Sequence, residues 1–264
     1  MLREDFMKPV VDKDELNTNF QKYYDPPEVL CIDESLITFC GRIVFRQYIK
    51  QRKHKYGIKL FKLCCGHGYT YNCNVYTKKG LDKENTTPSN VVMSLLKNLF
   101  HRGHTLCTDN WYTSIDLANR LIEKNAHLTG TLRTNRRENP SDVIRTNLKR
   151  GELIAKENNQ GITVLKWKDK RDFLVLSTKH SSEMINIKTK RRFCCKPQII
   201  VEYKKKTSID LSDEMSAYSS PLRKTLKWYK KLAFELYLNT AVINSLFVFQ
   251  EVTGQKISVT EFRR

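Results

Sequence analysis

The feature that restricts the fold most is a strand, a helix and a second strand in close succession. The strands are indicated at 105–108 and around 127–134. The helix between them has an apolar face formed by Ile115, Ala118, Leu121 and Ile122. A crossover of this length joins parallel strands, because a tight hairpin can join only antiparallel ones. We therefore expect a parallel pair of strands with a helix packed on it.

Three further strands are predicted before this segment, at 29–42, 56–65 and 69–77. The last two flank Gly66-His67-Gly68, which is a hairpin signal. A helix is predicted at 85–103, because Thr87 is a good N-cap, Pro88 suits the first helical position and Gly103 stops a helix. These strands and helices indicate an α/β fold with a mixed sheet, and not a doubly wound one.

The second half of the chain changes character twice. Residues from about 139 to 200 alternate β-rich runs with Gly and polar turns, which suggests a separate β-rich insertion. Helical sequence follows; it is interrupted at Pro221 and resumes as a long helix that is basic at its start and apolar at its end. The expected divisions are a tail or remnant at 1–24, the first part of a core at 25–138, the basic insertion at 139–205, closing helices at 206–250 and a second tail at 251–264.

The charge of the chain is large and unevenly distributed. The net charge is +19, yet residues 1–34 contain four basic and nine acidic side chains, whereas residues 145–206 contain 17 basic and six acidic ones. Such an asymmetry usually indicates a polyanionic partner, and nucleic acid is the first candidate in an intracellular protein. A basic protein without such a partner is the alternative.

The composition argues against several other classes of protein. At 40% hydrophobic and 28% charged residues, the chain is not of disordered composition. We find no apolar run long enough to cross a bilayer and no signal peptide, so we expect an intracellular protein with no membrane partner. Cys64, Cys65, His67 and Cys73 could suggest zinc, but adjacent cysteines on a strand point to opposite faces and no CxxC spacing is present. Small buried hydrophobes are the favoured interpretation.

Acidic residues stand at three places where a site could form. Asp109 directly follows the strand at 105–108, and Asp33 lies within the first strand. If these strands are neighbours, the two carboxylates could face each other, and Asp210 or Asp213 could complete a site for divalent cations. Each acid also has an ordinary explanation, as a turn residue, a solvated strand residue or a helix cap.

Several blocks of sequence, in order, resemble the piggyBac family of transposases and their domesticated derivatives. They include CIDESLITFCGRIVFRQYIKQRKHKYGIK, TDNWYTSIDLANRL, GTLRTNRRENP, KWKDKRDFLVLSTKH and IDLSDEMSAYSSPLRKTLKWYKKLAFELYLNTAVINS. The similarity covers roughly residues 25–249. It implies a ribonuclease-H-like catalytic domain with a β-rich insertion. It also implies a DDD-type site in which Asp33, Asp109 and Asp210 hold two Mg²⁺ or Mn²⁺ ions, with Asp213 as an additional acid of the same motif.

The resemblance implies DNA as the partner, with transposon ends cut through hairpin intermediates and joined at TTAA targets. It leaves a homodimer open, and it implies the nucleus as the location. We assign contacts to DNA phosphates to Arg133, Arg136, Arg137, Lys190, Arg191, Arg192, Arg223, Lys224, Lys227, Lys230 and Lys231. The alternative for the basic residues of the closing helices is a solvated helix face.

Two departures from the family pattern affect the functional interpretation. Only about 24 residues precede the first matching block and the tail after Phe249 lacks cysteine, so we expect the flanking DNA-binding and cysteine-rich modules to be absent or truncated. Lys206-Thr207-Ser208-Ile209 stands where the family has glycines before the third acid. A metal-dependent transposase core is therefore one hypothesis, and a catalytically silent DNA-binding or chromatin-associated derivative is the other. An unrelated RNA-binding protein would not explain the ordered acids.

Overall fold

The computed structural model describes residues 13–50, 55–65, 68–76, 87–188, 193–204 and 227–264. The chain divides into two compact units. Of the described residues, the first contains those within 13–27, 32–76 and 227–264, and the second contains those within 28–31 and 87–204. Strand β1 (Val29–Thr38) is continuous and contributes residues to both.

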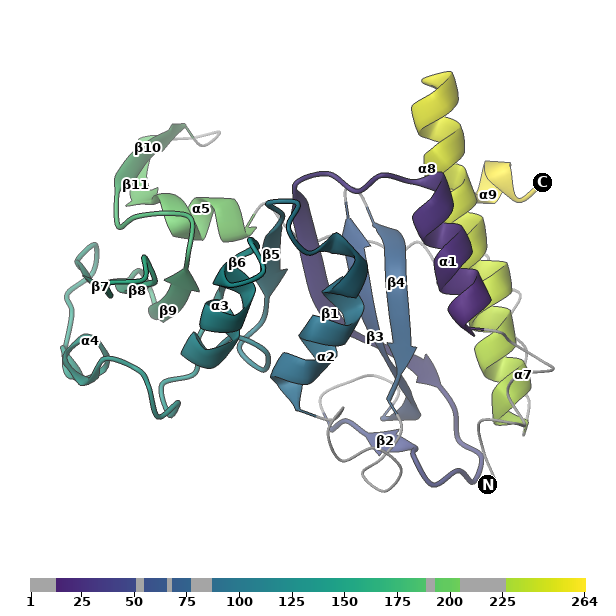
Figure 1. The fold of residues 1–264 in the computed structure, drawn as a ribbon, viewed down its shortest axis with the longest axis horizontal. Helices are drawn as coiled ribbons and strands as arrows, with labels where there is room; N and C mark the ends of the chain where they lie inside the picture. Colours follow the sequence, from purple (N-terminus) through teal and green to yellow (C-terminus); the bar gives the residue numbers. More distant parts are fainter. Residues whose placement is uncertain (1–12, 51–54, 66–67, 77–86, 189–192, 205–226) are drawn as a thin grey trace. The chain divides into compact units, whose positions relative to one another are not determined.

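The described strands form one mixed nine-stranded sheet and a separate two-stranded sheet. The order in the large sheet is β2-β3-β1-β5-β6-β9-β8-β7, with β4 also paired to β3 (Figure 1). Beside β1, its strands are β2 (Gln47–Tyr48), β3 (Tyr56–Cys65), β4 (Tyr69–Val75), β5 (Thr105–Thr108), β6 (His127–Thr131), β7 (Leu153–Glu157), β8 (Thr163–Lys168) and β9 (Asp172–Ser177). Strands β5 and β6 are parallel, as the sequence predicted. The expected α/β class with a mixed sheet is confirmed.

In the first unit, part of the expected N-terminal tail is helical. Helix α1 (Lys13–Tyr23) buries Leu16 and Phe20, and it contacts β4 and the C-terminal helix α8 (Figure 1). The apolar residues recur at a spacing of four, which places them on one face of the helix. Residues 13–23 are therefore folded on the first unit, and the division of 1–24 as a remnant or tail remains a prediction.

Two asparagine side chains cover the backbone of β4. Asn17 of α1 accepts a hydrogen bond from the Cys73 amide at 3.0 Å and donates one to the Cys73 carbonyl at 3.0 Å. Asn244 of α8 makes the same pair of bonds with Thr70, at 2.9 and 2.8 Å. An asparagine amide thus takes the place of a neighbouring strand, which satisfies backbone groups that an edge strand would otherwise leave unpaired.

The long C-terminal helix consists of three segments: α7 (Trp228–Ala233), the π-helical η3 (Phe234–Thr240) and α8 (Ala241–Thr253). By length and composition this helix could cross a membrane, which the sequence analysis did not anticipate. It buries Leu232, Leu236 and Ile243 in the first unit, and a core helix of a folded domain has the same composition. Beyond α8, the short helix α9 (Val259–Phe262) packs back on it.

In the second unit, the helices follow the local signals of the sequence. Helix α2 (Pro88–Leu96) begins after Thr87, whose hydroxyl accepts from the Asn90 amide at 3.3 Å, and a 3₁₀ turn (Lys97–Leu99) follows it. Helix α3 (Ile115–Ile122) begins after Ser114, whose hydroxyl accepts from the Leu117 amide at 3.1 Å. The first helical segment ends at Leu99, before the predicted stop at Gly103, because Phe100 is already extended. Gly103 has φ +73°, a left-handed conformation that suits glycine, in the turn that follows.

The region from 139 to 200 is β-rich as expected, but it is not a separate unit. Strands β9, β8 and β7 extend the large sheet, because β9 pairs antiparallel with β6 through Thr129 and Ser177. Only the hairpin of β10 (Met184–Lys188) and β11 (Phe193–Pro197) lies outside that sheet among the described strands. The helices of this region are α4 (Ser141–Arg145) and α5 (Gln198–Lys204). Helix α5 packs Ile199 and Ile200 against Leu165, Trp167 and Val175 in a common core.

Candidate active site

Asp109 lies immediately after β5, at the carboxyl end of a parallel strand, where ligand sites of such sheets form. Its side chain is half-buried, and its Oδ1 accepts a hydrogen bond from the Trp111 amide at 2.9 Å. Its carbonyl accepts from both the amide and the hydroxyl of Thr113, at 3.1 and 2.7 Å. The loop therefore holds Asp109 at both its backbone and its carboxylate.

The loop rests on Gly130 of β6, a residue that the sequence analysis did not assign to the site. Gly130 is the partner of Thr108 in the β5–β6 register, and the hydroxyls of Thr108 and Thr113 lie 2.8 Å apart. A Cβ on Gly130 would lie 2.3 Å from the Thr113 hydroxyl and 2.6 Å from the Thr108 carbonyl. The available signal was a glycine inside a predicted strand, which often indicates close backbone approach.

A second loop, directly after β6, supports the first. Arg136 donates from Nη2 to the Trp111 carbonyl at 2.7 Å, and Arg133 donates from Nε to Asn110 Oδ1 at 3.0 Å. Asn139 donates in turn to the Arg133 carbonyl at 2.7 Å. Two of the arginines that were assigned to DNA phosphates thus make hydrogen bonds to the loop that carries Asp109.

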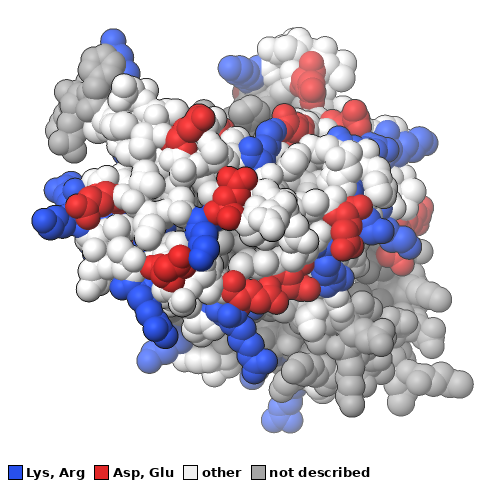
Figure 2. All heavy atoms as spheres, turned by 60° about the vertical axis from the view of Figure 1, so that its left-hand side comes forward, with Lys and Arg blue, Asp and Glu red and all other residues white. Residues whose placement is uncertain are grey.

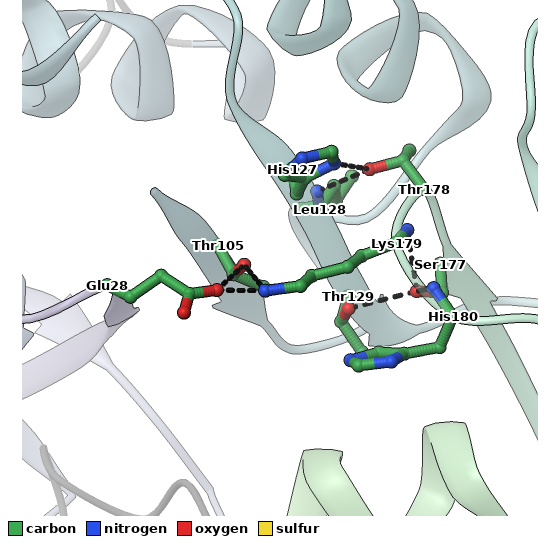
Figure 3. Close-up of polar contacts among 9 residues, drawn as sticks. All are labelled: Glu28, Thr105, His127, Leu128, Thr129, Ser177, Thr178, Lys179 and His180. Atoms are coloured by element: carbon green, nitrogen blue, oxygen red, sulfur yellow. Dashed lines mark hydrogen bonds and ion pairs between the residues drawn. The ribbon is translucent and has the colours of Figure 1, made fainter. Parts of the chain in front are cut away.

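The start of β1 is anchored at the opposite end of β5. The Thr105 amide donates to the Glu28 carbonyl at 2.7 Å, and the Thr105 hydroxyl donates to the Glu28 carboxylate at 3.2 Å. Figure 3 shows that Lys179 also reaches this carboxylate, with which it forms an ion pair. Thr178 and Ser177 connect the same cluster to β6 through His127, Leu128 and Thr129 (Figure 3). These bonds hold the residue that precedes β1 against β5 within the second unit.

Asp33 lies on β1, five residues after Glu28, and is half-buried. Its Oδ1 accepts from the amide of Glu34, and Glu34 forms an ion pair with Lys59 of β3 at 2.6 Å. One carboxylate oxygen from each of Asp33, Glu34 and Asp109 lies within 4.8 Å of the others, so this acidic group could hold a metal ion. Carboxylate oxygens are the ligands that Mg²⁺ and Mn²⁺ prefer, so the donor set fits such an ion.

The remaining predicted site residues divide into two sets. Asp210, Asp213, Lys190, Arg191, Arg192, Arg223 and Lys224 lie outside the described residues. Arg137, Lys227 and Lys230 are exposed, and Lys231 is half-buried in α7. The assignments of these residues to metal or DNA therefore remain predictions.

The basic charge of the β-rich region is partly neutralised within the protein. Lys156 pairs with Asp142 at 2.9 Å, and both Lys166 and Lys168 pair with Asp172, at 3.5 and 2.6 Å. The hydrogen bond from Lys168 holds the pKa of the Asp172 carboxyl below its ordinary value. On the face drawn in Figure 2, Lys and Arg side chains are interspersed with Asp and Glu side chains. The number of charges in the sequence therefore overstates the number available to a polyanion.

An apolar groove in the first unit contains none of these acids. It has a volume of about 490 Å³ and lies between α1 and α8, where Phe20, Tyr69 and Val248 contribute to its lining. Its lining is mostly apolar and offers no carboxylate. The acidic group around Asp109, rather than this groove, is therefore the candidate for chemistry on phosphates.

Comparison with known proteins identifies the family to which this chain belongs. The family described as Transposase IS4 matches residues 8–246. The cryo-EM structure of a piggyBac transposase synaptic complex with hairpin DNA superimposes with a TM-score of 0.87 at 29% sequence identity. That match covers 99% of this chain and 56% of the piggyBac chain, so this chain spans little more than half of its relative. The chain therefore belongs to the IS4 transposase family, and within it to the piggyBac type.

Proposed function

We propose that this chain is the catalytic core of a piggyBac-type DNA transposase that cleaves and joins DNA strands with divalent metal ions. The observation that carries the proposal is the fixed position of Asp109 at the end of β5, within an acidic group that also includes Asp33. Family membership supports a transposase, and the acidic group supports metal-dependent chemistry.

Asp33 and Asp109 would be two of the ligands of Mg²⁺ or Mn²⁺, and we assign the third position to Asp210, with Asp213 as an additional acid. When bound, the metal ions would activate a water or a DNA 3′-hydroxyl and stabilise the leaving oxygen of an in-line displacement. The protein contributes orientation. The Trp111 amide fixes one oxygen of Asp109, and the Glu34 amide fixes one oxygen of Asp33. Hydrogen bonds of this kind hold ligand carboxylates in one rotamer.

DNA is the proposed substrate and partner. The net charge of +19 supports a polyanion, and the similar piggyBac structure is a complex with hairpin DNA. We further propose TTAA as the sequence at which strands are joined, assembly as a homodimer and a nuclear location. Binding itself, as distinct from joining, should show little sequence preference, because contacts to phosphates carry no base sequence. It should weaken steeply with salt, because each neutralised phosphate releases counterions.

The test is metal-dependent nicking of supercoiled plasmid. Asp33→Asn, Asp109→Asn and Asp210→Asn should each abolish nicking in Mg²⁺ and in Mn²⁺, because each replaces a charged ligand with a neutral amide. Asp116→Asn is the matched control, since Asp116 is an exposed acid on α3 that contacts Arg120 at 4.0 Å and accepts a hydrogen bond from Ser89 at 3.1 Å. A wild-type chain that binds DNA without nicking it would instead be a silent DNA-binding derivative.

A further inference from the structure

Arg136 is hydrogen-bonded within the protein, unlike an exposed arginine whose guanidinium is available to a DNA phosphate. It is half-buried, and its Nη2 donates to the Trp111 carbonyl at 2.7 Å. The amide of the same Trp111 donates to Asp109 Oδ1. One residue therefore receives the arginine on its carbonyl and holds the aspartate through its amide.

The neighbouring contacts restrict the same loop from other directions. Thr113 holds the Asp109 carbonyl, and Arg133 holds the side chain of Asn110. A charge-assisted hydrogen bond to a carbonyl is stronger than a neutral one, so Arg136 is a substantial part of this support. The carbonyl and the amide of Trp111 lie in successive peptide planes that are joined at its Cα, so Arg136 restrains the backbone next to the amide that donates to Asp109. Without Arg136, a change in the backbone angles of Trp111 would move this amide away from the Asp109 carboxylate.

We propose that Arg136 is a positioning residue that orients Asp109 for metal, and that it is not primarily a DNA-phosphate contact. This inference rests on the proposed function, because it takes Asp109 as a metal ligand. Loss of groups that orient metal ligands typically weakens metal affinity by about 10–100-fold. Arg136 acts through one intervening residue, so we expect its loss to weaken metal affinity by the lower end of this range, about tenfold.

The experiment compares Arg136→Met with Arg137→Met in the full chain. Methionine keeps an aliphatic stem but has no donor. Arg137 is the matched control, because it is adjacent and exposed, and the structure records no hydrogen bond or ion pair for its described side chain. Mn²⁺ affinity is measured by calorimetry without DNA, with Asp109→Asn as the reference for loss of the site. DNA affinity is measured by fluorescence anisotropy across a range of salt concentrations.

We expect Arg136→Met to weaken Mn²⁺ binding about tenfold while the slope of log affinity for DNA against log salt stays unchanged. Arg137→Met removes an assigned phosphate contact, so it should lower the salt slope by about 0.9, whereas Mn²⁺ affinity measured without DNA should stay unchanged. Wild-type Mn²⁺ affinity in Arg136→Met, or a salt slope that falls by about 0.9, would overturn the proposal, because the second result is that of a lost phosphate contact.

Amide hydrogen exchange separates this proposal from the proposed function and from general misfolding. The amides of Trp111 and Thr113 should exchange faster in Arg136→Met, while the amides of β8 and β9 keep their wild-type rates. Unchanged exchange at Trp111 and Thr113 overturns the supporting role of Arg136. If instead Asp109→Asn binds Mn²⁺ as tightly as the wild type, the metal site itself is refuted, and with it the orientation of Asp109 for metal.

Discussion

Adding a single methyl group at Gly130 should disturb both the stability of the second unit and its metal affinity. In Gly130→Ala, the new Cβ would lie 2.3 Å from the Thr113 hydroxyl, 2.7 Å from the Thr108 hydroxyl and 2.6 Å from the Thr108 carbonyl. Atoms at such distances must move apart. The third contact involves backbone, so rotation of a side chain cannot relieve it.

The size of the effect follows from these contacts. Overpacking a close-packed site costs about 1–3 kcal/mol. Separating the Thr108 and Thr113 hydroxyls costs a further hydrogen bond, about 1 kcal/mol. Alanine offsets about 0.4–1 kcal/mol by restricting the unfolded chain. We therefore expect Gly130→Ala to lower the free energy of unfolding by about 2–3 kcal/mol.

Urea unfolding, followed by circular dichroism, measures this change as a lower midpoint at constant slope. Mn²⁺ titration should show weaker binding, because Thr113 also holds the Asp109 carbonyl. Thr113→Ala should cost less in the Gly130→Ala background than alone, since one of the close contacts is then absent. A Gly130→Ala protein within about 0.5 kcal/mol of the wild type would refute the close packing of this loop on β6.

Three further predictions concern other parts of the molecule. Asn244→Ala should lower the free energy of unfolding by about 2–4 kcal/mol in urea, because it leaves the buried amide and carbonyl of Thr70 without the partner they have now; a change below about 1 kcal/mol would argue against the edge-covering role. Glu28→Lys should weaken Mn²⁺ binding, and the charge-swapped double variant Glu28→Lys/Lys179→Glu should recover part of it; equal affinities in all three proteins would show that this pair does not position β1. Burial raises the pKa of Tyr24 to about 12, above the ordinary value of 10.0, so the unfolded state binds fewer protons between these values and stability should fall as pH rises from about 10 to about 12. Tyr24→Phe should flatten this fall in equilibrium unfolding measured at several pH values, and an unchanged slope would contradict the assignment.

The starts of helices α2 and α3 could be predicted well from the sequence. The caps Thr87 and Ser114 accept hydrogen bonds from amides three residues later, so the information that begins each helix lies within one turn of it. The parallel pair β5–β6 followed from the length of the crossover, and the place of Asp109 followed from the end of its strand. All of these inferences depend on short-range geometry that the order of residues contains directly.

What only the tertiary structure decided is which distant segments meet. Strand β9 pairs with β6 across 48 positions at Thr129 and Ser177, and this places the supposed insertion in the main sheet. Asn244 binds Thr70 across 174 positions, and Arg136 binds Trp111 across 25. Local patterns show that a strand or a polar side chain exists, but its partner depends on which edges and faces the whole chain brings together. The sequence alone therefore determined the strands and helices on either side of Asp109 and the place of this acid in the chain, while packing determined what holds that acid in position.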